Sequence, residues 1–166
     1  MSAVEPTRGV PIGLSLFATL VAVAAIVLVP TEASAKKEKA DLVVKSVDTG
    51  DSAEVGATFV VIDLVKNIGK HTAGKSTVGY SLSEDRKAGG GDVKVPGARD
   101  VKKLKPKESS RGSTDLVLPA KVEPGNYFLI ACADRGKAVK EKSESNNCRS
   151  TQEKFSVQDI PGRAGA

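Results

Sequence analysis

The sequence has no tryptophan, one histidine, two cysteines, two tyrosines and four phenylalanines among its 166 residues. Enzymes take nucleophiles, acids and bases largely from histidine, cysteine and paired carboxylates. Zinc sites use histidine and cysteine, and base-stacking surfaces use aromatic rings. The composition therefore argues against an enzyme, a zinc protein and a nucleic-acid-binding protein. The net charge of +5 is modest, and the length is typical of one compact domain with some residues left over.

One long uncharged run lies near the N-terminus, at residues 12–29. Arg8 precedes it and Ala33-Ser34-Ala35 follows it, which is the arrangement of a secretory signal peptide. We expect residues 1–35 to be this signal peptide and the remainder to be secreted or otherwise extracytoplasmic. The run also reaches the lower length limit for spanning a bilayer. An uncleaved anchor is therefore the alternative, and membrane contact is expected only in that case.

The remainder shows short apolar runs separated by turn residues, without an apolar stripe at helical spacing over three turns. This pattern is typical of an all-β protein. The expected strands are 42–47, 59–66, 77–83, 93–95, one within 99–107, 113–118, 127–133 and 151–157. About seven strands predict an antiparallel β-sandwich of the immunoglobulin or fibronectin III type. We expect residues 36–40 to be a charged leader, 41–158 to be the domain and 159–166 to be a flexible tail.

Five segments, in order along the chain, carry a resemblance to a known family. They are Ala40-Asp41-Leu42-Val43-Val44, Lys66-Asn67-Ile68-Gly69, residues 76–83 (STVGYSLS), residues 124–134 (PGNYFLIACAD) and Glu144-Ser145-Asn146-Asn147-Cys148. The sequence resembles the bacterial CARDB domain, the cell-adhesion-related domain, over about residues 41–157. The resemblance implies an extracellular immunoglobulin-like sandwich that serves as a spacer or adhesion module. The family has no common catalytic motif, so the resemblance implies neither an enzyme nor a particular ligand.

The second expected strand departs from the family pattern. Asp63 interrupts its inward-facing set, whereas Val60, Ile62 and Leu64 occupy the face that is usually polar. One interpretation is that the strand is covered on both faces, or is shifted by one residue through a bulge. The other is that Val60, Ile62 and Leu64 form an apolar patch for a partner or for a second copy of the chain.

Cys132 lies near the end of one expected strand, and Cys148 lies at the start of the next. An even number of cysteines in an exported chain predicts a disulfide, whereas redox sites usually have a C-x-x-C spacing. We therefore expect a Cys132–Cys148 bond that closes the base of a hairpin loop. It is worth roughly 3 kcal/mol in the chain-entropy description.

The loop between the cysteines, residues 134–147, holds side-chain oxygens of the kind that bind calcium. They belong to Asp134, Glu141, Glu144, Asn146 and Asn147. Four cations lie among them, at Arg135, Lys137, Lys140 and Lys142, and no D-x-D-x-D-G spacing occurs. We therefore expect turn formation and capping of the backbone by the asparagine and serine side chains, with no metal and no cofactor. Because sandwich loops carry binding residues on a rigid scaffold, this loop is also a candidate for specific recognition.

Residues 94–111 are the one strongly asymmetric charged stretch. Its cations are Lys94, Arg99, Lys102, Lys103, Lys105, Lys107 and Arg111, against only Asp100 and Glu108. One interpretation is that these lysines protect an edge strand from pairing with other chains. The other is a binding surface for anionic wall polymers, acidic polysaccharide or lipid head groups. Nucleic acid fits poorly, because the stretch lacks interleaved aromatic residues and the chain is expected to be exported.

These observations favour a non-catalytic, exported module of the CARDB type that contacts surface proteins or cell-envelope carbohydrate. A structural spacer or envelope protein without a specific ligand is the alternative. An unrecognised hydrolase has the least support, because no G-x-S-x-G or comparable nucleophile motif occurs. The sequence predicts no particular oligomeric state.

Overall fold

The structure is a computed structural model, and it describes residues 38–159. The expected signal peptide, the first two residues of the expected leader and the tail from residue 160 lie outside the described residues. Nine strands follow one another in the described part. They are β1 (Leu42–Thr49), β2 (Ser52–Glu54), β3 (Thr58–Asn67), β4 (Ser76–Ser83), β5 (Val93–Val101), β6 (Ser109–Val117), β7 (Gly125–Cys132), β8 (Cys148–Ser150) and β9 (Phe155–Gln158). No helix in this part of the chain is long and apolar enough to cross a membrane.

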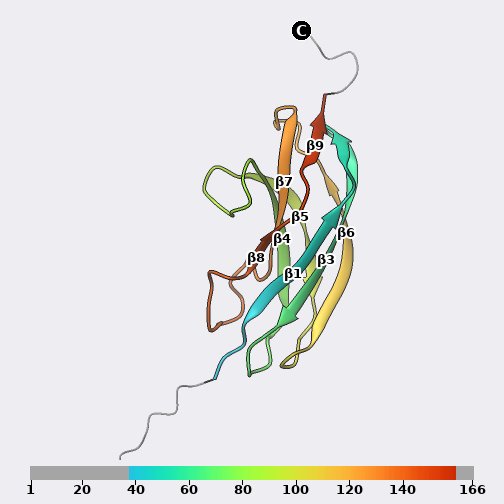
Figure 1. The fold of residues 1–166 in the computed structure, drawn as a ribbon. Helices are drawn as coiled ribbons and strands as arrows, with labels where there is room; N and C mark the ends of the chain where they lie inside the picture. Colours follow the sequence, from blue (N-terminus) through green and yellow to red (C-terminus); the bar gives the residue numbers. More distant parts are fainter. Residues whose placement is uncertain (1–37, 160–166) are drawn as a thin grey trace, which may run out of the picture. The chain divides into compact units, whose positions relative to one another are not determined.

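The strands form two sheets, which make the two layers of a sandwich (Figure 1). The first sheet has the order β1-β3-β6. The second has the order β2-β9-β7-β4-β5, with β8 paired to β7. The pairings between these strands are antiparallel except for the parallel pair β2 and β9. The predicted all-β sandwich is therefore confirmed.

Two short strands, β2 and β8, are not apparent from the sequence pattern. Each has three residues, which is too few to show the alternation of apolar and polar positions that marks a strand. β8 pairs with the end of β7 so that Cys148 lies directly opposite Cys132. β9 begins at Phe155 rather than at the expected residue 151. A local turn precedes it, in which the Thr151 hydroxyl donates to the Glu153 carbonyl at 2.8 Å.

The two strands expected on either side of Pro96 and Gly97 are one continuous strand, β5. The register of β4 against β5 shifts once, and these two residues form the resulting bulge. Gly97 has a φ of 109°, a backbone conformation that glycine adopts far more readily than other residues. A Cβ at this position would lie 2.7 Å from Leu116 Cδ2. Glycine thus allows β5 to bend close to β6 and continue to its end.

The core lies between the sheets and contains side chains from both. Fully buried members include Leu42, Val61, Val65 and Leu116 from the first sheet and Tyr80, Leu82, Leu129 and Phe155 from the second. The rings of Phe59 and Phe155 pack with their centroids 5.0 Å apart. Ala40 is 3% exposed and belongs to this core. The expected boundary between leader and domain after residue 40 is therefore wrong by at least one residue, because Ala40 packs as part of the domain.

β3 has one inward and one outward face along its whole length. The inward residues are Phe59, Val61, Asp63 and Val65. On the outward face Val60 is 51% exposed, and Ile62 and Leu64 are half-buried. β3 keeps one register with β6, and the bulge against β1 lies in β1, between Val44 and Ser46. The interpretation that β3 is covered on both faces or shifted in register is therefore wrong.

Candidate functional site

Four segments come together at the end of the sandwich where β1 begins (Figure 1). They are residues 38–41, 68–75, 102–108 and 133–147. The Ile68 N–H donates to the Asp41 carbonyl at 2.7 Å, and the Lys142 N–H donates to the Ala40 carbonyl at 2.8 Å. An isolated β-bridge joins segment 68–75 to segment 102–108. These backbone contacts hold residues that are far apart in the sequence in one surface region.

Exposed cations outnumber exposed carboxylates in this region, which we call the basic end. The exposed cations are Lys39, Lys70, Lys75, Lys102, Lys103, Lys105, Lys107, Arg135, Lys137, Lys140 and Lys142, and the exposed carboxylates in or beside the segments are Glu38, Asp100, Glu108 and Glu144. Lys70 pairs with Glu38 at 2.7 Å, and this contact lowers the pKa of Glu38 and raises that of Lys70. Such a concentration of one charge sign creates a positive potential that attracts anions.

The predicted basic run is divided among several places. Lys102, Lys103, Lys105 and Lys107 lie together at the basic end, in the connection between β5 and β6. Lys94 lies near the other end of β5, about 20 Å away at the usual rise of a strand. Arg111 is exposed on β6, opposite the outward-facing Leu64.

Arg99 is the exception among the predicted binding residues, because it is only 8% exposed. It lies inside the sandwich, and its prediction as part of a binding surface is wrong. Along β5, Arg99 falls on the inward face and Lys94 on the outward face. The charge run alone cannot distinguish these faces, because its cations occupy both odd and even positions along the chain.

A groove of about 610 Å³ opens at the basic end, at the start of β4 and the end of β5. Its lining consists of Lys75, Ser76, Thr77, Asp100, Val101, Lys102, Lys103 and Ala138. This volume lies in the range of small-ligand sites. Nothing in the sequence pattern points to Lys75 and Ser76, because only the pairing of Ser76 with Val101 brings them beside the basic run.

The groove combines buried and exposed polar groups. Ser76 is 6% exposed and lies beside the exposed Lys75 and Lys102. Among the described residues, Ser76 Oγ has no hydrogen-bond partner, although buried polar atoms are nearly always paired. Asp100 is exposed and adds one carboxylate acceptor. The Ser76 hydroxyl is shielded from solvent, so the groove offers a ligand ammonium donors and one acidic acceptor.

The predicted disulfide between Cys132 and Cys148 is present, and it closes the base of loop 133–147. Inside the loop the Asp134 carboxylate accepts the N–H groups of Ala138 and Val139 at 3.1 and 2.8 Å. This backbone capping comes from an aspartate, whereas the sequence predicts it from the asparagine and serine side chains of the loop. The Arg135 N–H donates to the Thr77 carbonyl at 3.2 Å, so the loop is held against β4. The loop thereby places Ala138 as one wall of the groove.

Glu141 attaches the same loop to the start of β1. Its carboxylate accepts one hydrogen bond from the Leu42 N–H and another, at 3.0 Å, from Asn147 Nδ2. Glu141 is 4% exposed, and this burial raises the pKa of its carboxyl to about 7. Within residues 38–159, no group of three or more His, Cys, Asp or Glu side chains is placed to hold a metal ion.

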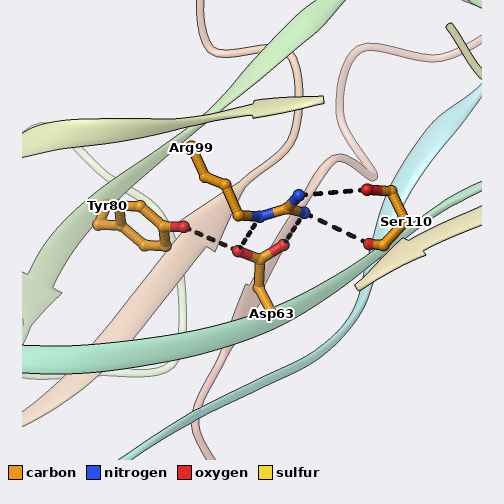
Figure 2. Close-up of polar contacts among 4 residues, drawn as sticks. All are labelled: Asp63, Tyr80, Arg99 and Ser110. Atoms are coloured by element: carbon orange, nitrogen blue, oxygen red, sulfur yellow. Dashed lines mark hydrogen bonds and ion pairs between the residues drawn. The ribbon is translucent and has the colours of Figure 1, made fainter. Parts of the chain in front are cut away.

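Asp63, the unexpected inward-facing residue of β3, binds Arg99. Figure 2 shows that the Arg99 guanidinium donates through two nitrogens to the Asp63 carboxylate and also contacts Ser110. Tyr80 Oη donates to Asp63 Oδ2 at 2.7 Å. Burial and this hydrogen bond raise the pKa of Tyr80, and the bond to Asp63 raises the pKa of Arg99. The groups of this cluster bind one another inside the sandwich, so it serves the structure rather than a ligand.

The outward face of β3 carries the predicted apolar patch of Val60, Ile62 and Leu64. Val117 on β6 extends it and is 51% exposed. Across the strands this face also carries Asp115 and Arg111, which pair with Val60 and Leu64. Contact of this patch with a partner or with a second copy of the chain stays a prediction.

A family model of the CARDB domain matches residues 39–151. No curated protein matches the chain. A CARDB domain from Pyrococcus furiosus, solved in complex with di-metal ions, is 22% identical to this chain with a TM-score of 0.50. The match covers 72% of this chain and 90% of that domain, and it shows the fold.

Two further solved structures are less similar. A domain from a Methanosarcina acetivorans protein, provisionally named as a cell surface protein, is 20% identical with a TM-score of 0.49. That match covers 76% of this chain and 99% of the domain. A β-glucosidase from Erythrobacter marinus is 17% identical with a TM-score of 0.46, over 72% of this chain and 16% of the enzyme.

Proposed function

The chain belongs to the CARDB family, and we propose that it is an exported, non-catalytic module that binds acidic polymers of the cell envelope through its basic end. The family is related to the bacterial cell surface and is not a catalytic one. The binding role and the kind of polymer are the proposal. They rest on the surface chemistry of this chain.

Two features support export. Residues 12–29 and Ala33-Ser34-Ala35 have the pattern of a signal peptide. The Cys132–Cys148 disulfide is a bond that persists in oxidising compartments outside the cytoplasm. Fractionation of producing cells, followed by N-terminal sequencing of the recovered protein, tests this part. Export with cleavage gives Lys36 as the first residue, a retained anchor gives the original N-terminus in the membrane fraction, and recovery in the cytoplasm contradicts export.

The observation that carries the binding proposal is the excess of exposed cations at the basic end. Four chain segments contribute to it, so it is a property of the folded surface and not only of the run at residues 102–107. Clustered cations attract a polyanion at long range, and salt screens that attraction. A polymer with repeated negative charges would engage several of these side chains at once.

Salt-dependent retention on immobilised alginate, an acidic polysaccharide, tests the proposal, with immobilised dextran as the neutral control. The protein is expressed from its full-length coding sequence. We expect retention on alginate at low salt, release at high salt and no retention on dextran. Equal retention on alginate and dextran would contradict binding through charge and would favour a spacer without a specific ligand.

A further inference from the structure

We propose that the groove at the start of β4 and the end of β5 binds a uronic acid unit, a sugar that carries a carboxylate, within a polysaccharide chain. This inference rests on the proposed function, and it names the place and the chemical class of the bound unit. Its argument depends on three exposed side chains of the groove: Lys75, Asp100 and Lys102.

Lys75 and Lys102 lie opposite each other, one residue beyond the paired ends of β4 and β5. Ser76 pairs with Val101 in the β4–β5 ladder, and the bridge between Ala73 and Leu104 continues the same register beyond it. Residue 75 therefore faces residue 102. Like charges directly opposite in an antiparallel pair are unfavourable, and neither ammonium group forms an ion pair with a carboxylate of residues 38–159. An anionic group bound between them would relieve the repulsion and form charge-assisted hydrogen bonds with both.

The remaining polar groups favour a sugar acid over other anions. Asp100 is an exposed carboxylate in the same groove, so it accepts hydrogen bonds and repels a second anion. Sugar hydroxyls can donate to it, whereas a phosphodiester has no hydrogen to donate. A uronic acid supplies both the anion and the hydroxyls.

An acidic peptide fits this place less well. Peptides commonly bind by adding a strand to a sheet edge, and β5 is the edge strand of its sheet. Beside β5, however, lies β6, with Arg99 Nη1 3.2 Å from Ser110 Oγ. The close approach at Gly97 also brings β5 against Leu116. These contacts hold β6 close to β5, so an added strand has less room here than a sugar has at the start of β4 and the end of β5.

The walls of the groove are held before a ligand arrives. The disulfide closes loop 133–147, and the Arg135 N–H fixes that loop to the Thr77 carbonyl at 3.2 Å. Sites that need little ordering on binding lose less affinity to entropy. The volume of about 610 Å³ is sufficient for a sugar unit, since small-ligand sites fall in the range of roughly 300 to 1,000 Å³.

Titration calorimetry with a defined oligogalacturonate tests the inference, with inorganic polyphosphate and poly-glutamate as the competing anions. The protein is again expressed from its full-length coding sequence. The groove variant is Lys75→Glu/Lys102→Glu. Its matched control, Lys87→Glu/Lys94→Glu, makes the same change of charge near the other end of β5. We expect oligogalacturonate to bind most tightly, with affinity reduced about tenfold or more in the groove variant and less than about twofold in the control.

Three single variants separate binding from folding. Lys75→Glu should raise the melting temperature slightly, because it places an acid opposite Lys102, while it weakens oligogalacturonate binding. Ser76→Ala should leave both the melting temperature and the binding of oligogalacturonate nearly unchanged, because the hydroxyl has no partner to lose and is shielded from the groove. Asp100→Ala should weaken oligogalacturonate binding and strengthen polyphosphate binding.

The outcomes that overturn the inference differ from those that overturn the proposed function. Equal loss of affinity in the groove variant and its control, or tighter binding of polyphosphate or poly-glutamate than of oligogalacturonate, overturns the groove as a uronic acid site. Retention on alginate would then still support the basic end as a polyanion surface. Absence of salt-sensitive retention on alginate overturns the proposed function itself.

Discussion

Arg99 on β5 binds Asp63 on β3 across the interior of the sandwich, with Arg99 Nε 2.8 Å from Asp63 Oδ2. The two strands belong to different sheets, so this pair ties one sheet to the other. Both side chains are buried, at 8% and 0% exposure. The pairing explains at once why an acid interrupts the apolar face of β3 and why one cation of the basic run is unavailable to a ligand.

Removal of either Asp63 or Arg99 alone should destabilise the protein far more, per side chain removed, than replacement of both by apolar residues. We expect Arg99→Ala or Asp63→Ala to lower the free energy of unfolding by about 3–5 kcal/mol, because the other charge stays buried without its partner. The double variant Asp63→Val/Arg99→Leu should lose much less than the sum of the single losses. Urea unfolding of the four proteins measures this difference. Additive losses would show that the two side chains act independently.

Gly97 should tolerate no side chain. Gly97→Ala places a Cβ 2.7 Å from Leu116 Cδ2 at a φ of 109°, and such strain costs about 1–3 kcal/mol. Gly90→Ala is the matched control, because a Cβ there meets no atom within 4 Å. Thermal unfolding of both variants should show a clear loss for the first and almost none for the second. Similar melting temperatures would argue against the tight bulge in β5.

Glu141 should make stability depend on pH. Burial raises the pKa of its folded-state carboxyl to about 7, above the ordinary value of 4.5. Between these values the folded protein binds more protons than the unfolded chain, so the free energy of unfolding falls as pH rises from about 4.5 to about 7. The contribution is roughly 3 kcal/mol. Urea unfolding between pH 4 and pH 8, roughly the span of this titration, measures it.

Glu141→Gln separates this effect from those of the other carboxyl groups. The amide cannot ionise, so we expect the decline over this pH window to flatten and the variant to be more stable than the original protein above pH 7. Glu123→Gln, an exposed acid elsewhere on the surface, should leave the decline intact. A decline that persists in Glu141→Gln would assign the pH dependence to another group.

The disulfide should stabilise the loop that forms one wall of the groove. Among the described residues no cysteine is free, so unfolded, unreduced protein should contain no reactive thiol. Cys132→Ser/Cys148→Ser should lose roughly 3 kcal/mol of stability and some affinity for acidic sugar, because the loop is less ordered. A reducing agent should lower the stability of the original protein and leave the stability of this variant unchanged. Two titratable thiols in the unreduced protein would contradict the bond.

The sequence predicts those strands in which apolar and polar residues alternate, and it misses the parts where the interior is polar. β4 is apparent because Val78, Tyr80 and Leu82 alternate with smaller residues. The first half of β6 is not, because its inward positions Ser110 and Gly112 accommodate the Arg99 side chain instead of filling an apolar core. A polar cluster inside a sandwich therefore removes the pattern by which its strands are recognised.

The residues of the candidate site, too, can be predicted from the sequence only in part. Lys102 and Lys103 are predictable because the charge excess around them is local in the sequence. Lys75 and Ser76 are not, because they join the groove through the register of β4 against β5. That register depends on a bulge at Gly97, which no periodicity indicates. The residues of a binding surface can thus be found from the sequence only where one segment supplies them.

The most direct test of binding through the basic end is the affinity for alginate of Lys102→Glu/Lys103→Glu, measured at several salt concentrations against Lys87→Glu/Lys94→Glu. The account predicts that the first variant binds about tenfold more weakly at low salt and shows a shallower dependence on salt, while the control stays within about twofold of the original protein. Equal affinities and equal salt dependence in the two variants would contradict it.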